Sequence, residues 1–188
     1  MKLERKVRLC SAAAAVLIAA IALTGCGGSK TTASSAAASS VAASTAAATN
    51  NSCGEGVTWA LADGTLTISG TGRMTNFTKD APAPWADQAD QITTVEVEGT
   101  VTSVGATAFK DCTALTTVNI ADGVEYIEVG AFNGCTALTE VNIPLSVGYI
   151  KTGAFKDCNA LTSVTIRDNC RLDMNVFPAT VAVNYAEG

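Results

Sequence analysis

Histidine is absent from the 188-residue chain, and aromatic residues make up only 5% of it. Without histidine, the Ser-His-Asp triad, the Cys-His pair, the HExxH zinc helix and imidazole as a general base are all excluded. The formal net charge is −5, and basic residues cluster only within the first eight positions. We therefore expect no nucleic-acid partner, because such binding depends on clustered Lys and Arg.

Long apolar runs are also scarce, and the one at residues 9–23 follows a basic start. As a helix it would cover about 22 Å, short of the roughly 30 Å of a bilayer core, so residues 1–25 predict a secretory signal rather than a permanent span. The run ends in LTGC at residues 23–26, which resembles the lipobox of bacterial lipoproteins. That resemblance implies a diacylglycerol on Cys26 and an extracytoplasmic, membrane-anchored location on the bacterial surface. An ordinary cleaved signal is the alternative.

Residues 26–52 predict a lipidated cysteine followed by a disordered tether. The stretch after Cys26 is rich in Ser, Thr and Ala, lacks aromatics and carries almost no charge. Interleaved Ser and Thr compete for backbone hydrogen bonds, which favours a linker over an alanine-rich helix. As a flexible coil, it would have an end-to-end distance of roughly 25 to 30 Å and keep the folded part near its anchor.

A 23-residue repeat begins at position 101 and continues without a gap from positions 124 and 147. The three copies read VTSVGATAFKDCTALTTVNIADG, VEYIEVGAFNGCTALTEVNIPLS and VGYIKTGAFKDCNALTSVTIRDN. Aromatic and sulfur positions coincide between copies, at Phe109, Phe132 and Phe155 and at Cys112, Cys135 and Cys158. A partial copy precedes them at residues 92–97, and a shortened copy follows residue 169.

A period in the twenties with an L-x-x-V-x-I core predicts a leucine-rich repeat solenoid. Val141 and Ile143 point to one face of a short strand, and Glu140 and Asn142 point to the other, as the pleat requires. Eight positions of the copy from residue 124 are apolar, and a single coil cannot bury them. We therefore expect stacked coils, with short parallel strands on the concave face, turns or short helical segments on the convex face, and covered ends.

The repeat resembles the BspA-like, treponemal-type class of bacterial surface leucine-rich repeats. In that class, C-x-x-L-x-x-I-x-I-P leads into L-x-x-I-x-x-x-A-F, and CTALTEVNIPLSVGYIKTGAF at residues 135–155 fits nearly throughout. Residues 57–74 also resemble the segment that commonly opens such domains. The resemblance covers about residues 53–185 and implies surface attachment through protein or matrix binding, without one shared ligand.

The segment before the repeats predicts an N-terminal cap over residues 53–91, followed by leucine-rich repeats with a C-terminal closing coil over residues 92–188. Trp59, Leu61, Leu66 and Ile68 lie at alternate positions on either side of an Asp63-Gly64 turn, which predicts a β-hairpin. Terminal repeats need an apolar plug, so we assign Trp59 and Trp85 to cap packing. The alternative is an aromatic platform for a sugar.

Five cysteines fall within the predicted domain, at positions 53, 112, 135, 158 and 170. Three share one repeat position and predict a buried ladder of free thiols, because cysteine behaves as a small hydrophobe. A Cys53–Cys170 disulfide would have to join opposite ends of the solenoid, beyond the roughly 7 Å limit between α-carbons. We expect no metal and no cofactor apart from the diacylglycerol on Cys26, since C-x-x-C, calcium-loop and phosphate-loop motifs are absent.

The outward side of the predicted strands is small, polar and mildly acidic, and it predicts the ligand-binding surface. Its candidate residues are Glu96, Asn119, Glu140, Asn142 and Thr165. We expect no catalytic residues. Glu96 and Glu98 would lie about 6.6 Å apart by strand rise, near the carboxylate spacing of inverting glycosidases, so a hydrolase is kept as a distant alternative.

These patterns predict a lipid-anchored bacterial surface protein with a short solenoid that binds an extracellular protein or glycan through its concave strand face. We expect it to be a monomer that contacts the membrane only through its lipid. The alternative is a non-catalytic structural or assembly component of the cell envelope. Such a component would self-associate through Tyr126 and Tyr149, which are equivalent residues one period apart.

Overall fold

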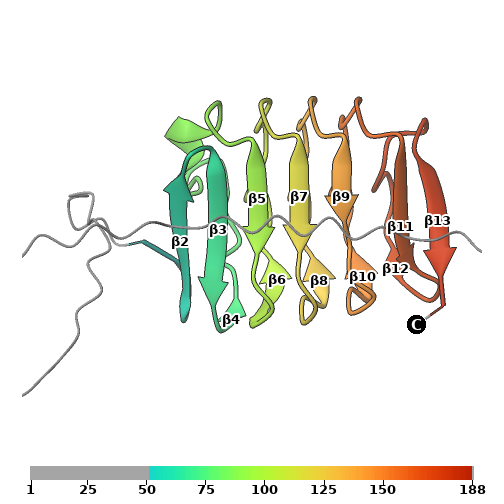
Figure 1. Ribbon diagram of the computed structural model, residues 1–188, viewed down its shortest axis with the longest axis horizontal. Helices are drawn as coiled ribbons and strands as arrows, with labels where there is room; N and C mark the ends of the chain where they lie inside the picture. The colour runs from blue at the N-terminus through green and yellow to red at the C-terminus, as the bar shows by residue number, and fades with distance from the viewer. Residues whose placement is uncertain (1–50, 188) are drawn as a thin grey trace, which may run out of the picture. The chain divides into compact units, whose positions relative to one another are not determined.

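The computed structural model describes residues 51–187, which form a winding of short strands connected by turns (Figure 1). The predicted signal peptide, the predicted lipidation site Cys26 and nearly all of the predicted tether lie outside the described residues. A single 3-10 helix, η1 (Ala86–Gln88), is found among the described residues. Each coil crosses from a first sheet to a second sheet and returns through a turn-rich segment.

Six strands form the first sheet, in the order β1-β2-β3-β5-β7-β9. They are β1 (Ser52–Gly54), β2 (Val57–Ala62), β3 (Thr65–Gly70), β5 (Thr94–Val97), β7 (Thr117–Ile120) and β9 (Glu140–Asn142). The first three are antiparallel, and β3, β5, β7 and β9 are parallel. Glu96 pairs with Asn119 and Asn119 with Asn142, so one coil corresponds to one 23-residue repeat.

Five short strands form a second sheet in the order β12-β10-β8-β6-β4, and all its pairings are parallel. They are β4 (Gly72–Arg73), β6 (Val101–Val104), β8 (Tyr126–Ile127), β10 (Tyr149–Ile150) and β12 (Arg171–Leu172). The sequence predicted turns on this side of the solenoid. Turns do connect the strands of the two sheets. The repeat pattern did not predict that the very short strands on this side pair with one another in a second sheet.

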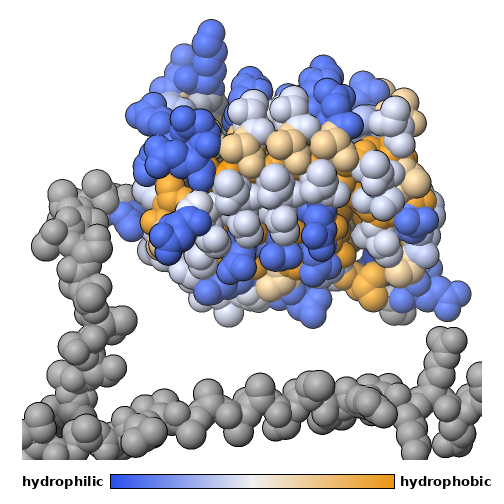
Figure 2. All heavy atoms as spheres, turned by 45° about the horizontal axis from the view of Figure 1, so that its top comes forward, coloured by the Kyte–Doolittle hydropathy of each residue, from blue (hydrophilic) through white to orange (hydrophobic). Residues whose placement is uncertain are grey.

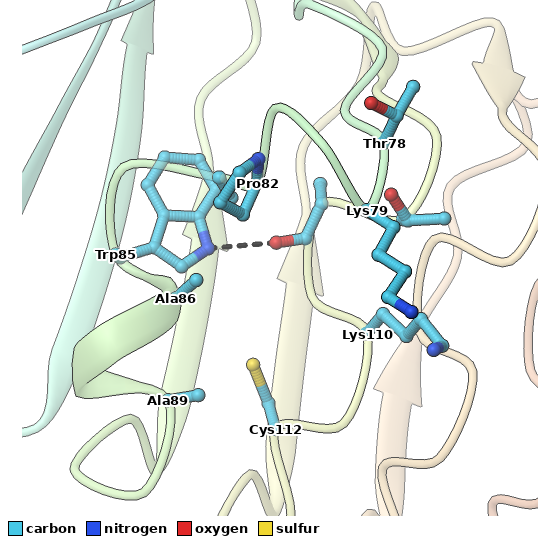
Figure 3. A pocket seen from close by; sticks show the side chains of 11 residues that line it. Thr78, Lys79, Pro82, Trp85, Ala86, Ala89, Lys110 and Cys112 are labelled. Carbon is cyan, nitrogen blue, oxygen red and sulfur yellow. Dashed lines mark hydrogen bonds between the residues drawn. The ribbon is translucent and has the colours of Figure 1, made fainter.

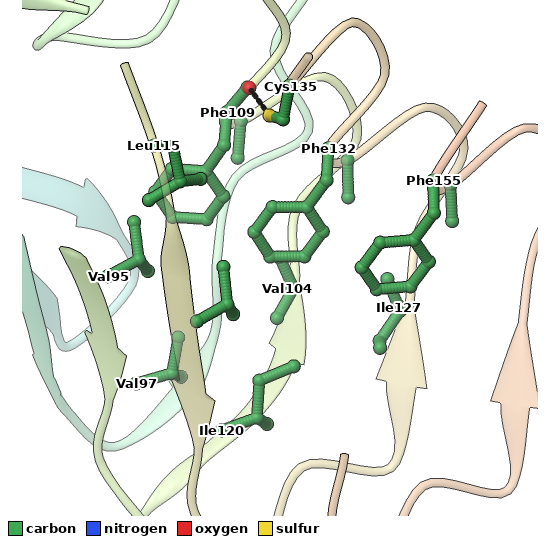
Figure 4. Close-up of a cluster of buried hydrophobic side chains, with 14 of the residues drawn as sticks. Val95, Val97, Val104, Phe109, Leu115, Ile120, Ile127, Phe132, Cys135 and Phe155 are labelled. Atoms are coloured by element: carbon green, nitrogen blue, oxygen red, sulfur yellow. Dashed lines mark hydrogen bonds between the residues drawn. The ribbon is translucent and has the colours of Figure 1, made fainter. Parts of the chain in front are cut away.

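A stack of aromatic rings runs through the coils and confirms the predicted equivalence of Phe109, Phe132 and Phe155 (Figure 4). Neighbouring ring centroids lie 5.0 and 5.1 Å apart, and all three side chains are fully buried. Trp85 extends the stack at one end at 5.5 Å, and Phe177 extends it at the other at 5.2 Å. Equivalent side chains from successive coils therefore share one continuous core, as expected for a solenoid.

The two ends of the solenoid differ from the coils between them. At the start, β2 and β3 form the expected hairpin, with Asp63 and Gly64 at φ values of 48° and 77° in its turn. Two consecutive residues with positive φ suit the twist of a tight hairpin, which favours Asp-Gly. At the other end, β11 (Ser163–Arg167) pairs with β13 (Ala182–Ala186) in parallel. Ser163 pairs with Ala182, so this closing coil spans 19 residues rather than 23.

Candidate functional site

All five predicted ligand-binding residues are exposed on the outward side of the strands, and we call them the polar strand face: Glu96, Asn119, Glu140, Asn142 and Thr165. Strand register aligns Glu96, Asn119 and Asn142 in one column. Val95 and Val118, which point to the other side of their strands, are fully buried, and Val141 is half-buried. The pleat thus gives each coil one apolar side and one polar side, and Figure 2 shows rows of similar hydropathy that recur from coil to coil.

A cleft of about 480 Å³ opens in this face between β9 and β11. Here β9 ends the six-stranded sheet, while β11 pairs with β13 in a separate two-stranded sheet. Four of the five predicted residues line the cleft: Asn119, Glu140, Asn142 and Thr165. The core beneath it is continuous, since Phe132 and Phe155 remain stacked and β10 pairs with β12.

The cleft alters one detail of the predicted core. Of the eight apolar positions in the copy from residue 124, seven are buried and Val141 is only partly buried. Its counterparts Val95, Val118 and Val164 are all buried. Val141 lines the cleft, so its side chain is not covered by an adjoining strand. Pro144, which has no N–H for a strand ladder, closes this coil soon after β9 and helps to keep the strand to three residues.

A shallower hollow of about 340 Å³ extends the polar strand face toward the N-terminal coils. It is lined by Glu96 and Glu98 and shares Asn119 and Asn142 with the cleft, so all five predicted residues belong to one continuous surface. Carboxylates, amides and a hydroxyl make this surface rich in hydrogen-bond acceptors with a few donors. Glu96 and Glu98 are both solvent-exposed, whereas a glycosidase general acid is typically held in a desolvated pocket.

Trp85 is fully buried, which confirms the cap-packing assignment for this residue. Its indole Nε1 donates a hydrogen bond to the Ala108 carbonyl oxygen at 2.8 Å (Figure 3). Its ring stacks on Phe109 and meets Trp59 and Phe77 edge-on, both at 5.7 Å. The ring faces are therefore occupied by protein and cannot serve as a sugar platform. A pocket of about 400 Å³ beside this indole is bordered by the lysines at positions 79 and 110.

The five cysteines of the described region are free thiols, and the predicted ladder is present. Cys112, Cys135 and Cys158 are buried. The thiols of Cys135 and Cys158 donate to the carbonyl oxygens of Phe109 and Phe132, at 3.1 and 3.2 Å. Burial, together with the charge of Asp111, raises the pKa of Cys112 to about 12. Cys112 is consequently protonated at neutral pH, and the three buried thiols act as core packing.

Glu128 is a buried carboxylate that pairs with two more exposed cations, a feature that was not predicted from the sequence. Its carboxylate accepts hydrogen bonds from Lys151 Nζ at 2.5 Å and from the Arg73 guanidinium at 3.4 Å. Arg73 lies 55 residues earlier in the chain, so neither periodicity nor local spacing could reveal the pair. On the same side of the solenoid, Tyr149 Oη donates to Asp173 Oδ1 at 2.7 Å. This hydrogen bond is the main cause of a lowered pKa at Asp173 and a raised pKa at Tyr149.

Among residues 51–187, no group of three or more His, Cys, Asp or Glu side chains converges in a way that could hold a metal ion. The same residues contain no helix long and apolar enough to cross a membrane.

The geometry defines a leucine-rich repeat solenoid with parallel sheets, and comparison with known families agrees. The family described as BspA type Leucine rich repeat region matches residues 87–184 in six copies. The chain belongs to this BspA-type leucine-rich repeat family, which confirms the resemblance inferred from the repeat motif. A comparison with curated proteins finds no match.

Solved structures of bacterial leucine-rich repeat proteins share the fold. A protein from Eubacterium ventriosum is 24% identical, with a TM-score of 0.55, over 70% of this chain and 42% of its own. A protein named as a leucine rich cell surface protein, from Faecalibacterium prausnitzii, is 24% identical, with a TM-score of 0.52, over 68% of this chain and 41% of its own. A third, from Bacteroides ovatus, is 22% identical, with a TM-score of 0.50, over 70% and 40%. This chain therefore spans about two fifths of the length of these proteins.

Proposed function

We propose that this protein is a lipid-anchored bacterial surface protein whose polar strand face binds an extracellular protein or glycan. The observation that carries this proposal is the convergence of four exposed polar residues, including Asn142 and Glu140, on one cleft of about 480 Å³ above an intact core. Side chains at such positions can vary without disturbing packing, which suits a binding surface on a repeat scaffold. Hydrogen-bonding groups without a desolvated acid or base favour binding over catalysis.

The surface location is supported by two independent observations. The basic start, the apolar run and the LTGC sequence at residues 23–26 fit a lipoprotein signal. One structural relative of the described domain is named as a cell surface protein. Two or three acyl chains on Cys26 would hold the protein on a membrane, whereas a single chain gives only reversible binding.

Binding through the polar strand face is tested by charge reversal. The full chain is assayed on an immobilised panel of extracellular matrix proteins and glycans, alongside the double variant Glu140→Lys, Asn142→Arg. A matched control, Asp90→Lys with Asn159→Arg, makes the same change in charge at exposed turn residues. We expect at least a tenfold loss of capture for the strand-face variant, with the control and both melting temperatures unchanged. Capture that survives charge reversal would place the ligand elsewhere.

The lipid anchor is tested separately by Cys26→Ala. We expect this variant to move from the membrane fraction to the culture medium, because the thioether cannot form. Cys10→Ala, in the preceding signal run, serves as the matched control and should leave the protein on the membrane. Membrane retention of the Cys26 variant would contradict lipidation at this residue.

A further inference from the structure

A second hollow of about 440 Å³ lies at the edge where the coils turn into the second sheet. It is bordered by Glu125, Tyr126, Gly148, Tyr149, Arg167 and Arg171. None of these residues belongs to the polar strand face. A site here would therefore be separate from the function proposed above, and either could fail without the other.

Gly148 stands between Glu125 and Arg171 at the equivalent position of successive coils and contributes no side chain to the hollow. Its backbone N–H donates to the Glu125 carbonyl oxygen at 3.0 Å, and its own carbonyl accepts from the Arg171 N–H at 2.9 Å. A Cβ built on Gly148 would meet nothing within 4 Å, and its φ lies outside the left-handed region. Neither steric crowding nor backbone conformation requires glycine here. The missing side chain leaves an opening between Glu125 and Arg171, about 9 to 10 Å apart by the spacing of parallel strands.

Two guanidinium groups border this opening without a salt bridge to a described residue, and the Asp173 carboxylate near Arg171 is already hydrogen-bonded to Tyr149. Between residues 51 and 187, neither Arg167 nor Arg171 forms an ion pair, whereas Arg73 and Lys151 share the Glu128 carboxylate. The same stretch holds seven Lys and Arg against sixteen Asp and Glu, so two unpaired cations at one hollow are not expected by composition. Planar guanidinium groups match a carboxylate with two parallel hydrogen bonds.

The aromatic walls of the hollow are held in place by neighbouring groups. Two cations lie over the Tyr149 ring, with the Arg171 guanidinium 5.1 Å and Lys151 Nζ 6.0 Å from its centroid, and the Tyr149 hydroxyl is fixed on Asp173. Arg73 lies 5.3 Å from the Tyr126 ring centroid. Both tyrosines are half-buried, so part of each ring is available to a ligand. Rigid aromatic walls with few convergent polar groups are typical of sites for small molecules, and the volume lies within their usual range of about 300 to 1,000 Å³.

We propose that this hollow binds a carboxylate-bearing sugar, such as a uronic or sialic acid at the end of a glycan. The sugar carboxylate pairs with Arg167 and Arg171. Its hydroxyl groups donate to the Glu125 carboxylate on the other side of Gly148, and its apolar ring face lies against a tyrosine ring. A phosphate or sulfate fits less well, because its charge is not confined to one end and Glu125 would repel it.

The test is a titration of the full chain, labelled with ¹⁵N, with the methyl glycosides of glucuronic acid and of N-acetylneuraminic acid as separate probes, both with a free carboxylate. Methyl glucoside is the neutral match for the first probe, and inorganic phosphate tests for simple anion binding. We expect shifts at the Gly148 and Arg171 amides with at least one acidic sugar, and at least tenfold weaker binding of the glucoside and of phosphate. The stronger of the two acidic sugars identifies the class. Equal binding of the neutral sugar or of phosphate would overturn the proposal.

Two kinds of variant localise the binding. Gly148→Leu fills the hollow and should weaken binding of the acidic sugar at least tenfold. The melting temperature should stay unchanged, because a side chain at this position meets open space. Arg171→Gln removes one charge at similar size and should weaken the acidic sugar at least fivefold but not the glucoside. Lys156→Gln, an exposed cation elsewhere, is the matched control and should change nothing. Undiminished binding by both hollow variants would overturn the proposal.

Discussion

Phe132→Ala is the sharpest perturbation of the shared core, because this ring is fully buried between two others. Its centroid lies 5.0 Å from that of Phe109 and 5.1 Å from that of Phe155. Truncation of a buried phenylalanine to alanine costs about 3 to 5 kcal/mol of unfolding free energy. Since two ring pairs are lost, each contributing about 0.5 to 1.5 kcal/mol, we expect a value near the upper end of that range.

The assay is urea unfolding followed by tryptophan fluorescence, with Trp85 at the end of the same ring stack. Phe177→Ala removes a half-buried ring with one neighbour in the stack and should cost about half as much. Val129→Ala, at a side chain that is 47% exposed, should change stability by less than about 0.5 kcal/mol. A loss below about 2 kcal/mol for Phe132→Ala, or one no larger than that for Phe177→Ala, would refute the continuous core.

Three further predictions concern individual groups. Glu128→Ala should lower the unfolding free energy by about 1 to 2 kcal/mol in the same assay. This is less than the cost of breaking a fully buried ion pair, because Lys151 remains partly hydrated. An unchanged unfolding free energy would contradict a stabilising role for Glu128. The hydrogen bond from the Tyr149 hydroxyl lowers the pKa of Asp173 below its ordinary value of 3.8. The ionised Asp173 carboxylate therefore stabilises the folded state above that pH, and this stabilisation is lost as the pH falls through the lowered pKa. Tyr149→Phe should therefore raise the pKa of Asp173 in a carboxyl-carbon NMR titration, and an unchanged value would refute this cause. With a pKa of about 12, Cys112 should react with a disulfide reagent at pH 8 at least 100-fold more slowly in the folded protein than in denaturant; similar rates would show that it is accessible.

The repeat core could be predicted from the sequence because it depends on periodicity. Phe109, Phe132 and Phe155 recur at one spacing, and equal spacing in a solenoid means equal environment. The hairpin at Asp63 and Gly64 could be predicted for a local reason, since the turn requires two residues with positive φ. The exposed polar strand face follows from the alternation of side chains along each strand.

Features that break the period could not be read in the same way. β9 and β11 belong to successive coils but to different sheets. Each of the two coils follows the repeat pattern, so nothing in either sequence indicates that their strands do not pair. In the Glu128 cluster, the contact with Lys151 joins equivalent positions one 23-residue period apart and could have been found from the repeat, whereas the contact with Arg73, 55 residues away, could not. The hollow at Gly148 did leave a signal, because glycine replaces the Glu125 of the preceding copy, but only the backbone geometry shows that no steric demand explains it.

The central claim is that each coil divides its strand residues between a buried core and a polar face that is free to vary. The most direct test is the unfolding free energy of a variant in which Glu96, Asn119, Glu140 and Asn142 are all replaced by threonine, the residue already present at position 165. Threonine suits an exposed strand, so we expect a change within about 1 kcal/mol of the unmodified protein. A loss as large as that of Phe132→Ala would show that these side chains hold the fold together, and it would contradict the account.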